Sequence, residues 1–97
     1  MSNYVLSPAA QADLEGIWEY TAQQWSLDQA EQYVRLLQRV IERAAAAPGI
    51  GRRCDEIRSG YFKLAAGAHV FFYRIANDGV MDVVRILHQR MDVDRSL

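Results

Sequence analysis

The chain contains a single cysteine, no long hydrophobic run and no lysine or arginine before Arg35. One cysteine, Cys54, excludes an internal disulfide and any zinc site built from several cysteines. Without a run of about 18 apolar residues, a transmembrane helix is excluded. The N-terminus also lacks a basic region followed by an apolar one, so we expect no secretory signal and a cytoplasmic location.

Several motifs that carry known chemistry are also missing. The chain has no Walker motif, no dinucleotide-binding fingerprint and no carboxylate pair placed for metal chemistry, so we expect neither a cofactor nor a metal. Cys54, His69 and His88 do not match the spacing of a known thiol–imidazole nucleophile. A hydrogen-bonded structural role is the commoner one for such histidines, although His88 beside a cationic cluster would be placed to act as an acid or base.

What the chain does contain is typical of one folded domain. Its 97 residues are 51% hydrophobic and 24% charged, which is too apolar for disorder and too short for two cores. We therefore expect a single domain over residues 1–97.

The charges are unevenly distributed along the chain. Residues 1–34 contain five acidic residues and no basic one, whereas residues 35–97 contain all 11 basic residues against seven acidic ones. The net charge of -1 therefore divides into -5 and +4. A basic C-terminal part is typical of a surface that contacts nucleic acid or an acidic protein, and the alternative is scattered solvated charge.

The first half of the chain predicts a short strand at residues 4–6 followed by two helices. Ser7–Pro8 provides an N-cap serine and a proline for the first helical position. Ser26 and Gln29 form a capping-box pattern, so a second helix starts directly after the first, and the pair makes an antiparallel hairpin that ends at Pro48–Gly49. The apolar faces contain Leu14, Ile17, Trp18, Thr21 and Trp25 in the first helix, and Ala30, Tyr33, Val34, Leu37, Val40, Ile41 and Ala44 in the second.

The second half predicts a loop and three strands. Residues 48–60 combine three glycines, a proline and three arginines and read as a loop. Strands are predicted at 61–65, 68–76 and 80–88, joined by short turns. The expected fold is α+β: a short N-terminal strand and an antiparallel helix hairpin packed on a three-strand antiparallel meander.

Turn lengths predict which side chains share a face of the meander. We expect two-residue turns at Ala66–Gly67 and Asp78–Gly79. The pairs that follow are Lys63–Val70, Tyr61–Phe72, Arg74–Val83 and Phe72–Arg85. The face toward the helices then contains Phe62, Leu64, Phe71, Tyr73, Ile75, Val84 and Ile86. A longer second turn would bury Arg85 without a partner, at a cost of several kcal/mol, so the two-residue turn is favoured.

This register leaves an open sheet face with Lys63, Arg74 and Arg85, close to the arginine-rich loop 48–60. Two interpretations remain open. The cations form a binding surface for an anionic target, or they merely keep an uncovered face in water.

Trp18 and Trp25 lie seven residues apart on one face of the first helix. Such a pair is typical of core packing, and a groove for a partner is the sharper alternative. Together with the acidic residues of this helix and the open sheet edge, the tryptophans predict a groove for a partner helix and an added strand.

Three segments carry a resemblance to a known family: SPAAQADLEGIWEY at the start, the PGIGRRCDEIRSGY loop and the final VVRILHQRMD. With the predicted order of elements, the whole chain resembles the ParE branch of the RelE/ParE toxin superfamily. The resemblance implies a cytoplasmic toxin of a type II toxin–antitoxin pair that inhibits DNA gyrase, blocks replication and arrests growth. It also implies that the toxin is not an enzyme and forms a hetero-oligomer with a ParD-like antitoxin.

Candidate contact residues follow from this resemblance and from the cationic face. The target-binding candidates are Arg58, Lys63, Arg74, Arg85, Arg90, Met91 and Asp92. The antitoxin-binding candidates are Trp18, Trp25 and Tyr33.

The alternative branch resembles RelE, a ribosome-dependent mRNA endoribonuclease that uses basic residues and usually a terminal tyrosine or histidine. That branch typically has an arginine three residues before the tyrosine of the middle meander strand, where this chain has Val70 before Tyr73. Tyr73 is also the last tyrosine of the chain. The residues left for such a nuclease are Arg74, Arg85, His88 and Arg90.

Overall fold

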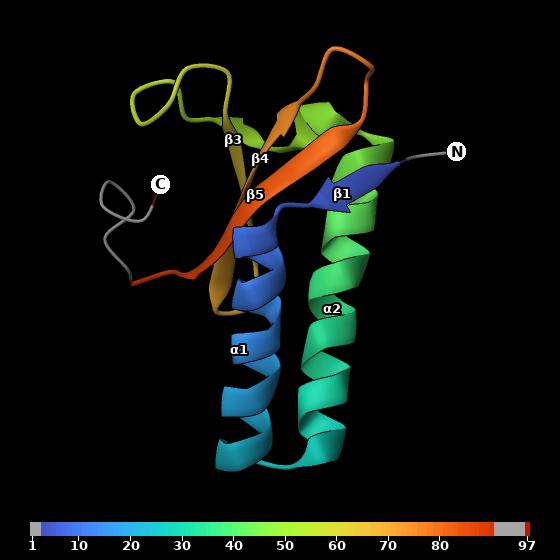
Figure 1. Cartoon of the computed structure of the whole chain (residues 1–97), viewed down its shortest axis with the longest axis vertical. Coiled ribbons are helices and arrows are strands. Elements are labelled where there is room, and N and C mark those ends of the chain that lie inside the picture. The colour runs from blue at the N-terminus through green and yellow to red at the C-terminus, as the bar shows by residue number, and fades with distance from the viewer. Residues whose placement is uncertain (1–2, 91–96) are drawn as a thin grey trace.

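Two long helices and a mixed sheet make up the fold in the computed structural model, which describes residues 3–90 and 97 (Figure 1). The elements are β1 (Tyr4–Leu6), α1 (Pro8–Gln24), α2 (Leu27–Ala46), a 3-10 helix (Pro48–Ile50), β2 (Arg52–Arg53), β3 (Phe62–Ala66), β4 (His69–Ile75) and β5 (Met81–His88). The predicted α+β class and the helix hairpin are confirmed. None of the helices in these residues is long and apolar enough to cross a membrane.

Both helices begin at the serines that the sequence indicates. The Ser7 hydroxyl accepts the N–H of Ala10, and the Ser26 hydroxyl accepts the N–H of Gln29, each at 3.0 Å. These bonds satisfy backbone donors that have no partner within the first turn of a helix. Because only two residues separate the helices, α2 turns back along α1 and the pair packs as an antiparallel hairpin.

The described residues form a five-stranded sheet in the order β1-β5-β4-β3-β2. β1 pairs in parallel with β5, and the other pairs are antiparallel, so the predicted meander forms the centre of the sheet. The prediction that residues 48–60 are only a loop is wrong, because this segment contains the 3-10 helix and β2. A two-residue strand shows no periodicity by which the sequence could predict it.

The register of the first hairpin differs from the predicted one. Lys63 pairs with Phe72 instead of Val70, and the turn consists of Gly67 and Ala68. Gly67 has a φ of 59°, a conformation that favours glycine, and this places it first in the turn. The error amounts to two residues along the partner strand, so each side chain still lies on its predicted face.

The second hairpin contains a β-bulge at Phe72/Tyr73 that the sequence does not predict. The Phe72–Arg85 pair is confirmed, but beyond the bulge Arg74 pairs with Asp82 and not with Val83. An extra residue on one strand exchanges the faces of the residues that follow it. As a result Val83 is fully buried in place of Val84. Ile75, also expected in the core, is 38% exposed.

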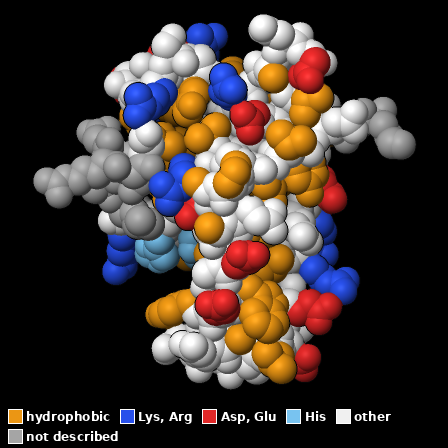
Figure 2. Space-filling view, viewed as in Figure 1, with side chains coloured by type: hydrophobic (Ala, Val, Ile, Leu, Met, Phe, Trp, Pro, Cys, Tyr) orange, Lys and Arg blue, Asp and Glu red, His pale blue; other side chains and the backbone are white. Residues whose placement is uncertain are grey.

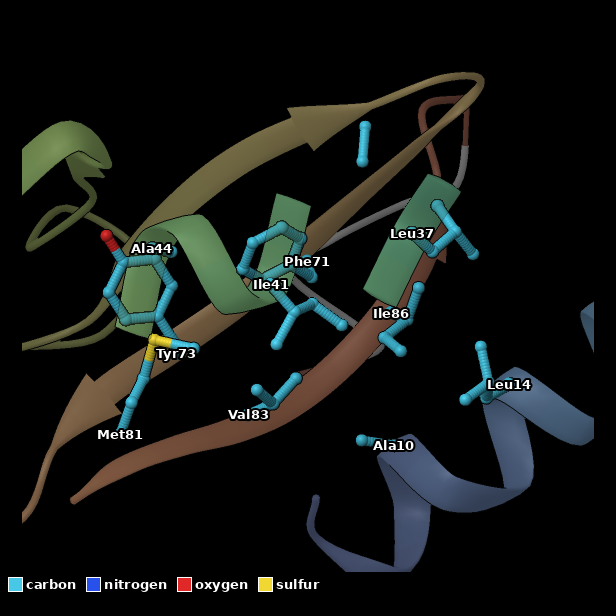
Figure 3. Close-up of a cluster of buried hydrophobic side chains, with 11 residues drawn as sticks. Ala10, Leu14, Leu37, Ile41, Ala44, Phe71, Tyr73, Met81, Val83 and Ile86 are labelled. Atoms are coloured by element: carbon cyan, nitrogen blue, oxygen red, sulfur yellow. The ribbon is translucent and has the colours of Figure 1, made fainter. Parts of the chain in front are cut away.

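The main core lies between the helix hairpin and one face of the sheet. Figure 3 shows side chains from α1, α2, β4 and β5 pointing into one shared space. The buried members are Ala10, Leu14, Leu37, Ile41, Ala44, Ala66, Phe71, Tyr73, Met81, Val83 and Ile86. The interpretation that the two tryptophans pack in the core is wrong, because Trp18 is 39% exposed and Trp25 is 73% exposed.

The opposite sheet face is less open than predicted. Cys54, Phe72 and Leu87 are buried there as a second cluster, with Ile57, Tyr61, Val70 and Leu97 packed against it. Burial raises the pKa of the Cys54 thiol. Cys54, Ile57 and Tyr61 of the loop provide much of this cover, so the centre of this face is apolar.

Candidate functional site

A cavity of about 350 Å³ opens on this second sheet face, and we call it the sheet hollow. Its lining includes Arg52, Lys63, Val70, Phe72, Leu87 and His88. Arg52 and Lys63 are cross-strand partners on β2 and β3, so their side chains share the face. Neither forms an ion pair within the described residues. The sheet hollow therefore combines an apolar floor with two cationic groups at its rim.

Arg52 is a site residue that the sequence did not single out. It lies in the segment that was expected to be a loop, where the position of a side chain cannot be derived from strand alternation. The signal that could have identified it is the Arg52–Arg53 pair next to a glycine, if a short edge strand had been assigned there. Arg53 instead donates from Nε to Asp55 at 2.9 Å.

Most of the other predicted target-binding cations are engaged elsewhere. Arg58 donates from Nη2 to the Leu97 backbone oxygen at 2.6 Å, and Arg74 lies 3.3 Å from Asp82 near the β4–β5 turn. Arg90 is exposed, and its backbone N–H donates to Nδ1 of His88 at 3.2 Å. The candidates Met91 and Asp92 lie outside the described residues. Among the members of the predicted set that the structure describes, only Lys63 lines the sheet hollow.

Arg85 contradicts the prediction that its side chain belongs to an open cationic face. Its Nε and Nη2 donate to the two carboxylate oxygens of Asp13 at 2.8 and 2.9 Å. The Ile86 N–H donates to the same carboxylate at 2.9 Å. The hydrogen bonds that Arg85 donates to Asp13 raise the pKa of Arg85. Since β1 pairs with β5 only as far as Val83, Asp13 binds the next part of that strand edge and joins α1 to the sheet.

A tyrosine and two histidines meet at the end of the sheet near the β3–β4 turn. Tyr33 Oη accepts the N–H of Ala68 at 2.9 Å and lies 2.6 Å from Nδ1 of His69, to which its own hydrogen can donate. His69 and His88 are cross-strand neighbours with ring centroids 5.4 Å apart. Desolvation, followed by the charge of His88, lowers the pKa of His69, against an opposing effect of Asp13. A neutral His69 thus joins α2 to the turn.

This arrangement predicts a pH dependence of stability. Because the pKa of His69 is lower in the folded state than the ordinary value of 6.5, the unfolded chain binds the extra proton more readily. Stability should fall as the pH drops below about 6.5 towards the folded-state pKa. Thermal melts of the parent and of His69→Gln at several pH values measure this effect, and the variant should show the shallower dependence. If both proteins lose stability equally as the pH falls, the pH dependence comes from titratable groups other than His69.

Two of the three antitoxin-binding candidates line one hollow. Trp25 and Tyr33 line a hollow of about 230 Å³ with Tyr20, Thr21 and His69, between the helix hairpin and the β3–β4 turn. Trp18 does not line it. Within residues 3–90 and 97, no group of three His, Cys, Asp or Glu side chains is placed to hold a metal ion.

Comparison with known sequences gives consistent matches along nearly the whole chain. The family model described as ParE toxin of type II toxin-antitoxin system, parDE, matches residues 4–93. Toxin ParE1 of Mycobacterium tuberculosis is 66% identical over 96 residues, covering 99% of this chain and 98% of its own. Toxin ParE1 of Caulobacter vibrioides is 45% identical, covering 95% and 94%. Toxin ParE of Escherichia coli is 34% identical, covering 96% and 90%.

Two solved structures share the fold at low sequence identity. One is titled as the chromosomal ParDE TA system from P. aeruginosa, with a TM-score of 0.78, 16% identity, and coverage of 91% of this chain and 96% of that one. The other is the RelBE2 toxin-antitoxin complex from Mycobacterium tuberculosis, with a TM-score of 0.62, 18% identity, and coverage of 91% and 98%. At these identities the likeness concerns the fold alone.

Proposed function

Because the chain belongs to the ParE toxin family of type II toxin–antitoxin systems, we propose that it inhibits DNA gyrase in the cytoplasm, blocks replication and so arrests growth. The observation that carries this proposal is the family match over residues 4–93. The relatives named Toxin ParE support it at 34% to 66% identity.

Inhibition by binding, without catalysis, is the mechanism we propose. The sheet hollow offers two cations above an apolar floor, which suits an acidic segment of a protein that also carries an apolar side chain. A ribonuclease would need its arginines available to RNA. Arg85 is instead held by Asp13, and Arg74 lies beside Asp82, which does not favour that alternative.

We also propose that a ParD-like antitoxin binds the helix hairpin to form a hetero-oligomer. Trp25, Tyr20 and Leu27 are 73%, 64% and 65% exposed, an unusual concentration of large apolar side chains at one end of a small protein. Exposed aromatic groups of this kind typically anchor protein interfaces.

The proposal is tested with purified protein in two parallel assays. We expect inhibition of gyrase supercoiling, or trapping of cleaved DNA, and no ribosome-dependent cleavage of mRNA. Normal gyrase activity at excess toxin, together with codon-linked cuts in mRNA, would reverse the assignment. Growth unaffected by folded, induced protein would instead indicate a binding module without toxicity.

The sheet hollow makes its own prediction about gyrase inhibition. Replacing Arg52 and Lys63 by alanine removes two groups that would contact an anionic surface, each contributing about 2 kcal/mol, or roughly 30-fold in affinity. The concentration needed for half-maximal gyrase inhibition should therefore rise by roughly 30-fold for either single variant and by roughly 1,000-fold for the double variant if the two losses add. Arg39→Ala, an exposed cation of α2, serves as the matched control. Unchanged inhibition by a double variant with a normal melting temperature would remove this surface from the mechanism.

A further inference from the structure

The sheet hollow has the size and the lining of a site for a small molecule. Its volume of about 350 Å³ lies within the range typical of ligand cavities, and Val70, Phe72 and Leu87 form its floor. Phe72 and Leu87 are fully buried and pack with Cys54 in the second cluster. Because this packing holds the floor in place, the sheet hollow is formed before any ligand enters it.

Strand pairing explains why this apolar surface is open. Ala65 pairs with Val70, and Val70 pairs with Leu87, so the three side chains form one row across β3, β4 and β5. β2 pairs with β3 only at Phe62 and Lys63, so no residue of β2 stands beside this row. Alanine at position 65 adds only a methyl group. In the part of the chain that the structure describes, a short edge strand and a small residue therefore leave a hollow beside Val70.

Two cations stand at the rim of the sheet hollow. Arg52 and Lys63 are directly opposite each other on β2 and β3, and like charges in such a pair repel. Within residues 3–90 and 97, neither forms an ion pair, and no aspartate or glutamate lines the sheet hollow. A bound anion would remove the repulsion between these two groups.

The charges on the face drawn in Figure 2 favour an anion on the sheet side. Lysine and arginine side chains lie around an apolar area at the top left, whereas several acidic side chains lie over the lower half of the helix hairpin. An anion is therefore attracted towards the sheet and repelled from this part of the hairpin.

We propose that the sheet hollow binds a small organic monocarboxylate with an aromatic body, and that this ligand regulates the toxin. The carboxylate would lie between Arg52 and Lys63, and the aromatic body would pack on Val70, Phe72 and Leu87. Ligand binding goes beyond the proposed function. The regulatory part rests on it, because the ligand would occupy the surface that an acidic segment of the target would contact.

The lining argues against other classes of ligand. A cation would be repelled by Arg52 and Lys63, and a neutral apolar molecule would cover these charges without replacing the water around them. A nucleotide carries several phosphate charges, which are typically bound by backbone N–H groups at a helix N-terminus or in a glycine-rich loop. Two cations above an apolar floor suit one carboxylate on an apolar body.

The test uses the purified full chain and two probes that share one ring system, 2-naphthoate and 2-naphthamide. The first carries a carboxylate and the second a neutral amide. We expect naphthoate to bind with a dissociation constant below about 1 mM, and naphthamide to bind at least about tenfold more weakly. The backbone amide signals of Lys63, Val70 and Leu87 should shift in NMR spectra, whereas those of α1 should not.

Two variants separate the roles of the apolar floor and of the charges. Ala65→Phe places a large side chain in the sheet hollow and should weaken naphthoate at least about tenfold with both cations present. Because Ala65 is exposed, this change should not unfold the protein. Arg52→Ala/Lys63→Ala should weaken naphthoate by a similar factor and change naphthamide less than about twofold. Arg39→Ala, an exposed cation of α2, is the matched control and should leave both affinities unchanged.

Several outcomes would overturn the ligand site. They are equal affinity for the two probes, no binding of naphthoate at about 10 mM, and NMR shifts confined to another surface. Unchanged naphthoate affinity in a folded Ala65→Phe protein would overturn it as well.

The regulatory part is tested in the gyrase supercoiling assay, with gyrase and probe in the absence of toxin as the control. At a naphthoate concentration about ten times its dissociation constant, the toxin concentration needed for half-maximal inhibition should rise about tenfold. The same concentration of naphthamide should change it much less. Naphthoate binding with unchanged inhibition would overturn the regulatory part. A toxin that binds naphthoate and never inhibits gyrase would contradict the proposed function, and the ligand site would stand.

Discussion

An Asp13→Ala protein is expected to melt at least about 10 °C below the parent, although Asp13 lies outside both candidate contact surfaces. The Asp13 carboxylate accepts hydrogen bonds from Nε and Nη2 of Arg85 and from the Ile86 N–H. The two side chains are only 15% and 25% exposed, so water cannot fully replace the lost acceptor. Leaving a poorly solvated arginine without its partner costs about 3 kcal/mol.

The comparison that isolates this pair is a double-mutant cycle with Arg85→Ala. If the ion pair carries the effect, the double variant should be little less stable than either single one. Arg74→Ala is the surface control, because its side chain is 54% exposed beside Asp82, and it should change stability by about 0.5 kcal/mol or less. Similar melts for Asp13→Ala and Arg74→Ala would contradict the structural role of the pair.

Gly51→Ala is expected to destabilise the fold by about 3 kcal/mol through overpacking. A Cβ atom at this position would lie 2.0 Å from Oη of Tyr73. The Tyr73 ring is fully buried and its hydroxyl donates to the Pro48 carbonyl at 2.6 Å, so it cannot move without breaking that bond. Chemical denaturation measures the loss in the free energy of unfolding.

A nearby glycine provides the control for this prediction. A Cβ atom at Gly49 would meet nothing within 4 Å, so Gly49→Ala should be close to neutral. Adding Tyr73→Phe to Gly51→Ala removes the atom of closest approach and should restore part of the lost stability. A Gly51→Ala protein as stable as Gly49→Ala would show that the 3-10 segment is free to move away from β4.

Local signals explain why the helical half of the fold is predictable. Ser7 and Ser26 each bond to a backbone N–H three residues ahead, a relation confined to one helical turn. The apolar face of α2 follows in the same way, because residues three and four apart share a side of any helix. The family resemblance, read from three quoted segments, is confirmed by the match over residues 4–93.

The three strands of the meander could be predicted from the sequence, whereas their register and the β-bulge could not. Alternation assigns a residue to one of two faces, and a register error of two residues does not change that assignment. A single-residue bulge does change it, which is why Val83 and not Val84 is buried. Sequence alternation cannot locate such a bulge, because both valines are apolar and either suits the core.

The sequence by itself determined the α+β class, the two capped helices, the meander and the toxin family, since these depend on contacts within a few residues or on similarity along the whole chain. Only the tertiary structure decided which charged and aromatic side chains are exposed to a partner and which are held in contacts within the chain. Asp13 and Arg85 are 72 positions apart, and their pairing arises because α1 packs alongside the edge of β5 where β1 ends. Likewise the 39% and 73% exposure of Trp18 and Trp25 comes from the tertiary structure, because helix periodicity contains no information about where the opposing layer stops.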